Sequence, residues 1–121
     1  RDTVRGVIAP RLLRRICPAC REEYRPSAQE WELLGVPEER RGIPLARGRG
    51  CDQCRKTGYR GRTCAMSLLE IGTHLRVAIG HVDFEGLKAA AREDGWHTLR
   101  EVAIEKVLRG ETTAEEAVRV T

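Results

Sequence analysis

Aromatic residues are scarce in this chain of 121 residues, which holds two tryptophans, two tyrosines and one phenylalanine. Large rings supply much of the apolar area that proteins bury. Because only 40% of the residues are hydrophobic and so few are aromatic, we expect one domain or two very small ones, without a large core. Such a chain gains more than most from a cross-link between distant segments.

Several functional patterns are also missing. The chain has no run of 18 apolar residues and no signal peptide, so we expect no membrane-spanning segment. The phosphate-binding loop Gly-x-x-x-x-Gly-Lys-Ser/Thr is absent, and no Ser-His-Asp or Cys-His arrangement has catalytic spacing. The histidines His74, His81 and His97 share no ligand spacing, and we interpret them as surface or capping residues. We therefore predict that these residues are not an enzyme by themselves.

Two cysteine pairs give the strongest signal, Cys17-Pro-Ala-Cys20 and Cys51-Asp-Gln-Cys54. Two thiols separated by two residues can bind one metal ion from a tight turn, and a second pair completes a tetrahedral zinc site. Because protein ligands fill all four positions, no position is left for water or substrate, and we interpret the metal as structural. Iron bound by four cysteines is one alternative to zinc, and thiols or disulfides without a metal are another.

The fifth cysteine, Cys64, lies outside this pattern. An odd number of cysteines, with four in metal spacing, indicates a reducing compartment such as the cytosol rather than a disulfide scaffold. We interpret Cys64 as a small buried residue in a strand. The alternative is a reactive thiol, activated by the basic loop that precedes it.

Positive charge is concentrated in the first half of the chain. Residues 1–62 hold 15 Lys and Arg against 8 Asp and Glu, whereas residues 63–121 hold 7 against 10. The first half could therefore face phosphates or an acidic protein surface, or it could be a solvated arginine-rich face. In the turn near its end, Arg60 and Arg62 are candidates for contacts with an anion or with an interface carboxylate, and solvated arginines are the alternative.

Helical spacing of apolar residues predicts a helix over residues 3–16. Val4, Val7, Ile8 and Leu12 occupy positions i, i+3, i+4 and i+8, which places them on one helical face. Pro10 interrupts this stripe, and we expect a kink or a break there because proline removes a backbone hydrogen bond.

Three capping boxes, each a Ser or Thr followed three residues later by Glu, mark further helix starts. They begin at Ser27, Thr98 and Thr113. The first helix should bury Trp31 and Leu34 before it ends at a glycine. The other expected elements are a loop over 36–50, a strand over 64–71, and helices over 73–79 and 83–94.

These elements predict a mainly α fold (α+β) with a small irregular zinc-binding module, short helices and at most one or two short strands. The expected organisation has three parts. They are a helix over 1–16, the zinc-binding module over 17–62, and a small helical lobe over 63–121.

Three stretches together resemble the C-terminal region of the ATPases of type II secretion and type IV pilus assembly, the GspE/PilB family. They are Val7–Cys20, then Gly50–Thr63 with Leu68-Leu-Glu70, and the ending from Leu99 to Thr121. The resemblance implies that the four paired cysteines carry zinc, and that residues 1–16 end an upstream RecA-like domain. Because the chain begins with Arg1, we expect a fragment. Pro10 and Cys64 depart from the family, which usually has glutamine and commonly has glycine at these positions.

The resemblance also implies a function. The family members are hexameric motors in the cytoplasm at the inner-membrane face, with neighbouring subunits and inner-membrane platform proteins as partners. ATP and magnesium would bind only in the upstream domain. We therefore expect a zinc-bound structural and interaction module without catalysis of its own. A nucleic-acid-binding zinc ribbon is the alternative, although few aromatics are available for base stacking, and a redox role fits poorly with four matched thiols.

Overall fold

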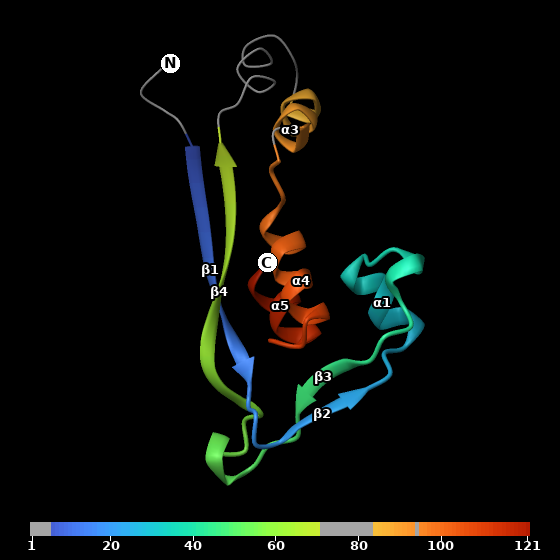
Figure 1. The fold of residues 1–121 in the computed structure, drawn as a ribbon, viewed down its shortest axis with the longest axis vertical. Coiled ribbons are helices and arrows are strands. Elements are labelled where there is room, and N and C mark those ends of the chain that lie inside the picture. Colours follow the sequence, from blue (N-terminus) through green and yellow to red (C-terminus); the bar gives the residue numbers. More distant parts are fainter. Residues whose placement is uncertain (1–5, 71–83, 94) are drawn as a thin grey trace.

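The computed structural model describes residues 6–70, 84–93 and 95–121, which form an α+β fold (Figure 1). Its four strands make two separate antiparallel pairs. The long pair joins β1 (Gly6–Ile16) to β4 (Tyr59–Glu70), and the short pair joins β2 (Arg21–Tyr24) to β3 (Leu45–Gly48). The prediction of a mainly α fold with at most one or two short strands is therefore wrong.

Helices lie between the two strands of the short pair and after the long pair. Short 3-10 helices are η1 (Glu38–Arg40), in the connection from α1 to β3, and η2 (Asp52–Cys54), just before β4. The four α-helices of the described residues are α1 (Ala28–Leu34), α3 (Phe84–Glu93), α4 (Leu99–Leu108) and α5 (Ala114–Val120). The helix expected over 73–79 lies outside the described residues, as do His74 and His81.

The helix predicted over 3–16 is wrong from residue 6 onward, because this segment is β1. It pairs with β4 over nearly its whole length, from Gly6 opposite Glu70 to Ile16 opposite Tyr59. Both faces of β1 carry apolar residues, Ala9 and Leu13 on one face and Ile8, Pro10 and Leu12 on the other. The apolar pattern therefore fits a helix as well as a strand. A partner strand more than 40 residues away along the chain decides between them.

Pro10 is compatible with β1 because its peptide nitrogen faces away from β4. The backbone N–H of Arg14 donates to the Glu116 carboxylate, and the Arg14 carbonyl accepts from Thr112. Even-numbered residues of β1 therefore direct their peptide groups to the outer edge of the strand, and Pro10 has the same parity. Proline is tolerated at such an edge position because no ladder hydrogen bond is lost.

The helix ends follow their local sequence closely. The side chains of Ser27, Thr98 and Thr113 each accept a hydrogen bond from the backbone N–H three residues later. Gly35 ends α1 in the left-handed conformation, with φ of 71°. The predictions for α1, α3, α4 and α5 are therefore confirmed, whereas the loop expected over 36–50 contains the unpredicted strand β3.

One hydrophobic core connects the long strand pair, α1 and the C-terminal helices. The buried side chains come from β1, β3 and β4, from α1 and the adjoining Val36, and from α4 and α5. Four of the ten core residues are alanines, whose small side chains let the elements pack closely. The core residues are Leu13, Trp31, Leu34, Val36, Leu45, Ala65, Ala103, Val107, Ala114 and Ala117.

Candidate metal centre

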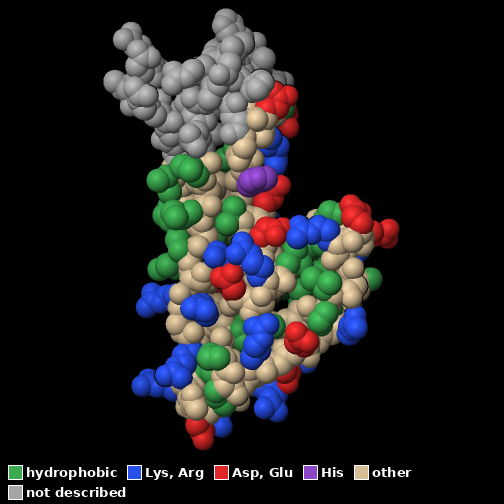
Figure 2. All heavy atoms as spheres, in the orientation of Figure 1, with side chains coloured by type: hydrophobic (Ala, Val, Ile, Leu, Met, Phe, Trp, Pro, Cys, Tyr) green, Lys and Arg blue, Asp and Glu red, His purple; other side chains and the backbone are tan. Residues whose placement is uncertain are grey.

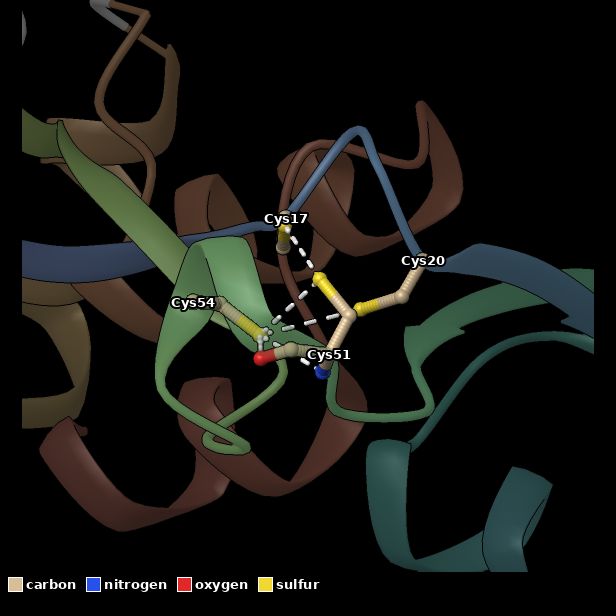
Figure 3. A group of neighbouring side chains, drawn as sticks. All are labelled: Cys17, Cys20, Cys51 and Cys54. Atoms are coloured by element: carbon tan, nitrogen blue, oxygen red, sulfur yellow. Dashed lines mark hydrogen bonds between the residues drawn. The ribbon is translucent and has the colours of Figure 1, made fainter.

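The four paired cysteines lie where the two strand pairs meet (Figure 3). Cys17 and Cys20 occupy the turn between β1 and β2, while Cys51 and Cys54 lie between β3 and β4. The two turns face each other because both strand pairs are antiparallel and share the same two connections. The two cysteine turns thereby bring together the two ends of the segment that carries β2, α1 and β3.

The distances between the sulfur atoms fit one tetrahedral ion. The Cys17–Cys51 and Cys20–Cys54 distances are both 3.8 Å, and the Cys51–Cys54 distance is 3.7 Å. All four sulfurs lie within 4.8 Å of one another. Sulfurs placed about 2.3 Å from a tetrahedral zinc ion are about 3.8 Å apart, whereas a disulfide brings two sulfurs to about 2.05 Å. The four thiols could therefore hold a metal ion, and zinc fits their geometry and chemistry.

Backbone amides support the sulfurs from the second turn. The Gly50 N–H donates to the Cys20 sulfur at 3.3 Å, and the N–H groups of Cys51 and Gly58 donate to the Cys54 sulfur at 3.2 Å. Hydrogen bonds of this kind favour thiolate over thiol and hold the ligands in place. The turn needs left-handed backbone, with φ of 99° at Gly50 and 83° at Gly58.

The thiols of Cys20 and Cys54 have pKa values shifted in opposite directions. Burial raises the pKa of Cys20 to about 11. Burial also acts to raise the pKa of Cys54, but hydrogen bonds from the amides of Cys51 and Gly58 and from neighbouring thiols lower it to about 6. Four thiols this close cannot all ionise without a cation among them, so a dication is the natural counter-charge.

The other residues singled out from the sequence lie away from this centre. Cys64 is exposed on β4, so its interpretation as a buried residue is wrong, while its place in a strand is confirmed. The Arg60 guanidinium donates to the Gln53 side-chain oxygen at 3.1 Å, and Arg62 is exposed. His97 is exposed, as expected for a surface histidine. The proposed anion or interface role of Arg60 and Arg62 stays a prediction.

Sequence reasoning missed a buried ion cluster beside the first cysteine turn. The Glu116 carboxylate has no exposed surface, and it accepts from the Arg14 guanidinium at 3.0 Å and from the Arg119 guanidinium at 2.8 Å. Arg14 also lies over the Tyr59 ring, 4.1 Å from its centroid. The sequence places Glu116 in a capping box, and its separation of 102 residues from Arg14 hides the pairing from local sequence patterns.

The cluster fixes the C-terminal segment to β1 directly before Cys17. In addition to the Glu116 contacts, the Ile16 N–H donates to the Glu111 carbonyl at 3.1 Å, and the Thr112 hydroxyl donates to the Arg14 carbonyl at 2.7 Å. α5 therefore orients the end of the strand that carries the first cysteine.

These features define an α+β protein with four thiols that could hold one metal ion between two strand pairs. Residues 1–119 match the family described as "Type II/IV secretion system protein", and the chain belongs to this family. The resemblance found in the sequence is thereby confirmed.

Named relatives place the chain among secretion and pilus proteins. It is 40% identical over 116 residues to the "Type II secretion system protein E" of Pseudomonas aeruginosa, covering 96% of this chain and 23% of that protein. It is 40% identical over 119 residues to the "Type IV pilus assembly ATPase PilB" of Thermus thermophilus, covering 96% and 13%. The "Type II secretion system ATPase E" of Vibrio cholerae is 33% identical over 116 residues, covering 96% and 23%. The chain thus spans about a quarter or less of these relatives.

Proposed function

We propose that these residues form a zinc-bound structural and interaction module of a motor ATPase that powers type II secretion or type IV pilus assembly. The family match carries the assignment to these machines, and two of the relatives are named as ATPases. The four-thiol geometry supports zinc as the resident metal. The sequence contains no Gly-x-x-x-x-Gly-Lys-Ser/Thr pattern, and in this proposal ATP and magnesium bind in a part of the polypeptide outside these residues.

The module acts by shape rather than by chemistry. A closed four-thiolate site offers no position for substrate, so zinc stabilises the two turns and the segment between them. In this proposal residues 17–62 form the zinc-binding part and residues 63–121 form the C-terminal lobe. Residues 6–16 end the upstream RecA-like domain as a strand, not as a helix.

The proposed surroundings follow from the same family. The parent protein assembles as a hexamer in the cytoplasm and docks at the inner-membrane face on platform proteins. Neighbouring subunits and these platform proteins are the partners of the module, and no nucleic acid is required. Within the described residues, no helix has the length and hydrophobicity needed to cross a membrane.

Elemental analysis together with an ATPase assay tests the proposal. We expect one zinc ion per purified chain and no ATP turnover by residues 1–121, with turnover restored in the complete polypeptide that carries them. Iron in place of zinc would contradict the metal assignment. Turnover by the isolated chain, or none by the complete polypeptide, would contradict the assigned role.

A further inference from the structure

The long strand pair has one covered face and one bare face. Figure 1 shows α4 and α5 on one side of β1 and β4, and no described element covers the other side. We call the bare side the outer face. Its side chains form three consecutive cross-strand pairs, Ile8 with Leu68, Pro10 with Met66, and Leu12 with Cys64.

The outer face is apolar and highly exposed. Hydrophobic side chains gather along the strand pair in Figure 2. Proteins that act alone rarely expose contiguous apolar patches larger than a few hundred Å², so this face is expected to be covered in the functional protein. The exposed fractions of its four largest side chains are 61% for Ile8, 57% for Leu12, 55% for Met66 and 51% for Leu68.

The opposite face of the same strands is already a buried face. Leu13 and Ala65 have no exposed surface, and Ser67 accepts a hydrogen bond from the Trp96 indole while donating to the His97 carbonyl. An antiparallel sheet with one solvated face usually alternates apolar and polar residues, whereas strands buried on both faces carry apolar residues on both. A two-stranded sheet is also only marginally stable by itself. The sequence of β1 and β4 is thus typical of a strand pair that is packed on both faces. The described residues cover only one of these faces.

The rest of a longer polypeptide could supply the surface that packs against the outer face. The chain spans 23% of the length of two relatives and 13% of a third, so most of a family member lies outside the matched residues. We propose that the outer face is an internal surface of the complete polypeptide, covered by an apolar surface of its nucleotide-binding part. This inference rests on the proposed function, which places these residues within a longer ATPase.

Charge adds a requirement for the covering surface. Next to the apolar pairs, at the end near the cysteines, Arg14 lies opposite Arg62. Arg14 is bonded to Glu116, whereas Arg62 is exposed and has no carboxylate partner among the described residues. Like charges directly opposite each other are unfavourable unless neutralised. The covering surface should therefore place aliphatic side chains over the three pairs and a carboxylate near Arg62.

Cys64 provides a native probe for this cover, because it is an exposed thiol of the outer face and is not one of the four clustered cysteines. The zinc-loaded isolated chain and the complete polypeptide are each treated with N-ethylmaleimide, and modification of Cys64 is followed by mass spectrometry. We expect rapid reaction in the isolated chain. In the complete polypeptide the reaction should be at least about tenfold slower, since it must wait for local opening.

Two variants serve as controls. Leu33→Cys, combined with Cys64→Ser, places a thiol at an exposed position of α1, and its reactivity should be equal in both proteins. Met66→Glu should leave the melting temperature of the isolated chain unchanged, because this side chain is exposed there, but should restore Cys64 reactivity in the complete polypeptide.

Each other outcome overturns the inference. Equal Cys64 reactivity in both proteins would mean that the outer face stays bare. Protection in the isolated chain that rises with protein concentration would assign the face to a second copy, and protection by vesicles of anionic phospholipid would assign it to a membrane. ATP turnover is measured on the same samples. Turnover with an unprotected Cys64 would refute this inference and leave the proposed function intact, whereas absent turnover would count against the proposed function.

Discussion

Glu116 shows how one buried side chain can fix the C-terminus of the chain to β1. Its carboxylate bonds two guanidinium groups and one backbone amide. Arg14 and Arg119 keep about half of their side-chain surface exposed, at 47% and 56%. Because the cations remain partly hydrated, desolvation falls mainly on the carboxylate, and the pairing can be net stabilising.

The unfolding free energy of the chain should therefore decrease at low pH, when Glu116 becomes protonated. Burial acts to raise the pKa of Glu116, but the bonds from Arg119 and Arg14 outweigh burial and lower it to about 2, against 4.5 for an ordinary glutamate. The contribution is fully present above pH 4.5 and is lost as pH falls toward 2, since the unfolded chain takes up the proton first. The shift corresponds to roughly 3 kcal/mol at neutral pH.

The Glu116→Gln variant isolates this contribution from the acid release of zinc, which affects both proteins alike. We expect the difference in unfolding free energy between the two proteins, measured in urea, to shrink by more than half between neutral pH and about pH 3. Glu115→Gln changes the exposed neighbouring residue and should have little effect. A difference that does not vary with pH would show that Glu116 is not ionised in its pair.

The five cysteines should divide into four that hold metal and one that does not. We expect Cys51→Ser to abolish zinc binding, because it removes one ligand of a closed four-thiol set, and to destabilise the segment over residues 17–60. Cys64→Ser should retain the full zinc content, since this thiol lies on the outer face. Metal content after gel filtration gives the answer. Zinc retained by Cys51→Ser would mean that another group completes the site.

Among the turns, the second cysteine turn depends on Gly58. Its φ is +83°, and a Cβ atom there would lie 2.6 Å from the Gly48 carbonyl oxygen. The Gly58 N–H also donates to the Cys54 sulfur, so displacement of this backbone reaches the metal centre directly. Gly42 has a similar φ of +94° but open space around the position of a Cβ.

Gly58→Ala should therefore be more harmful than Gly42→Ala. For Gly42→Ala we expect a loss of about 1 kcal/mol in unfolding free energy, from the left-handed backbone alone. Gly58→Ala should cost clearly more and should also weaken zinc binding, because its Cβ would collide with backbone. Chemical unfolding and competition with a zinc-binding dye measure the two effects. Equal losses in both variants would contradict the steric role assigned to the close approach.

Elements set by local sequence were predictable, and elements set by distant partners were not. The ends of α1 and α4 follow from Ser27, Gly35 and Thr98, whose hydrogen bonds span only a few residues. In contrast, β2 and β3 are four residues long and pair across about 20 intervening residues. Such short segments show no hydrophobic periodicity from which a strand could be predicted. The sequence of β1 predicts a helix as readily as a strand, because apolar residues lie on both of its faces.

Only the part of the site that depends on the spacing of the cysteines could be predicted from the sequence. The two cysteine pairs predict a shared metal, and the structure brings their sulfurs together. The amide donors of Gly50 and Gly58 and the pairing of Glu116 with Arg14 depend on contacts between segments far apart in the chain. Long-range packing of this kind is not encoded in the spacing of neighbouring residues.

The chain as a unit combines a cluster of four cysteines with a separate apolar core. The clustered cysteines contact one another rather than the main core, which is formed by β1, α1, β3, β4, α4 and α5. Between the two cysteine turns, β2 and β3 offer only four residue pairs. A strand pair this short is marginal without further support. In the proposed zinc-bound chain, the metal and the buried side chains of α1 together hold the segment over residues 17–60.

Removal of zinc should therefore loosen one part of the chain before the other. With a chelator and a reductant present, we expect backbone amides of residues 17–60 to lose protection against hydrogen exchange, while α4 and α5 keep theirs longer. Their contacts with each other and with β1 and β4 do not involve the four clustered cysteines, which lie outside these elements, and local stability follows such contacts. Exchange mass spectrometry of the zinc-loaded and chelated chains tests this order. Equal loss across the chain would mean that the core depends on the metal, and unchanged protection would refute a structural role for zinc.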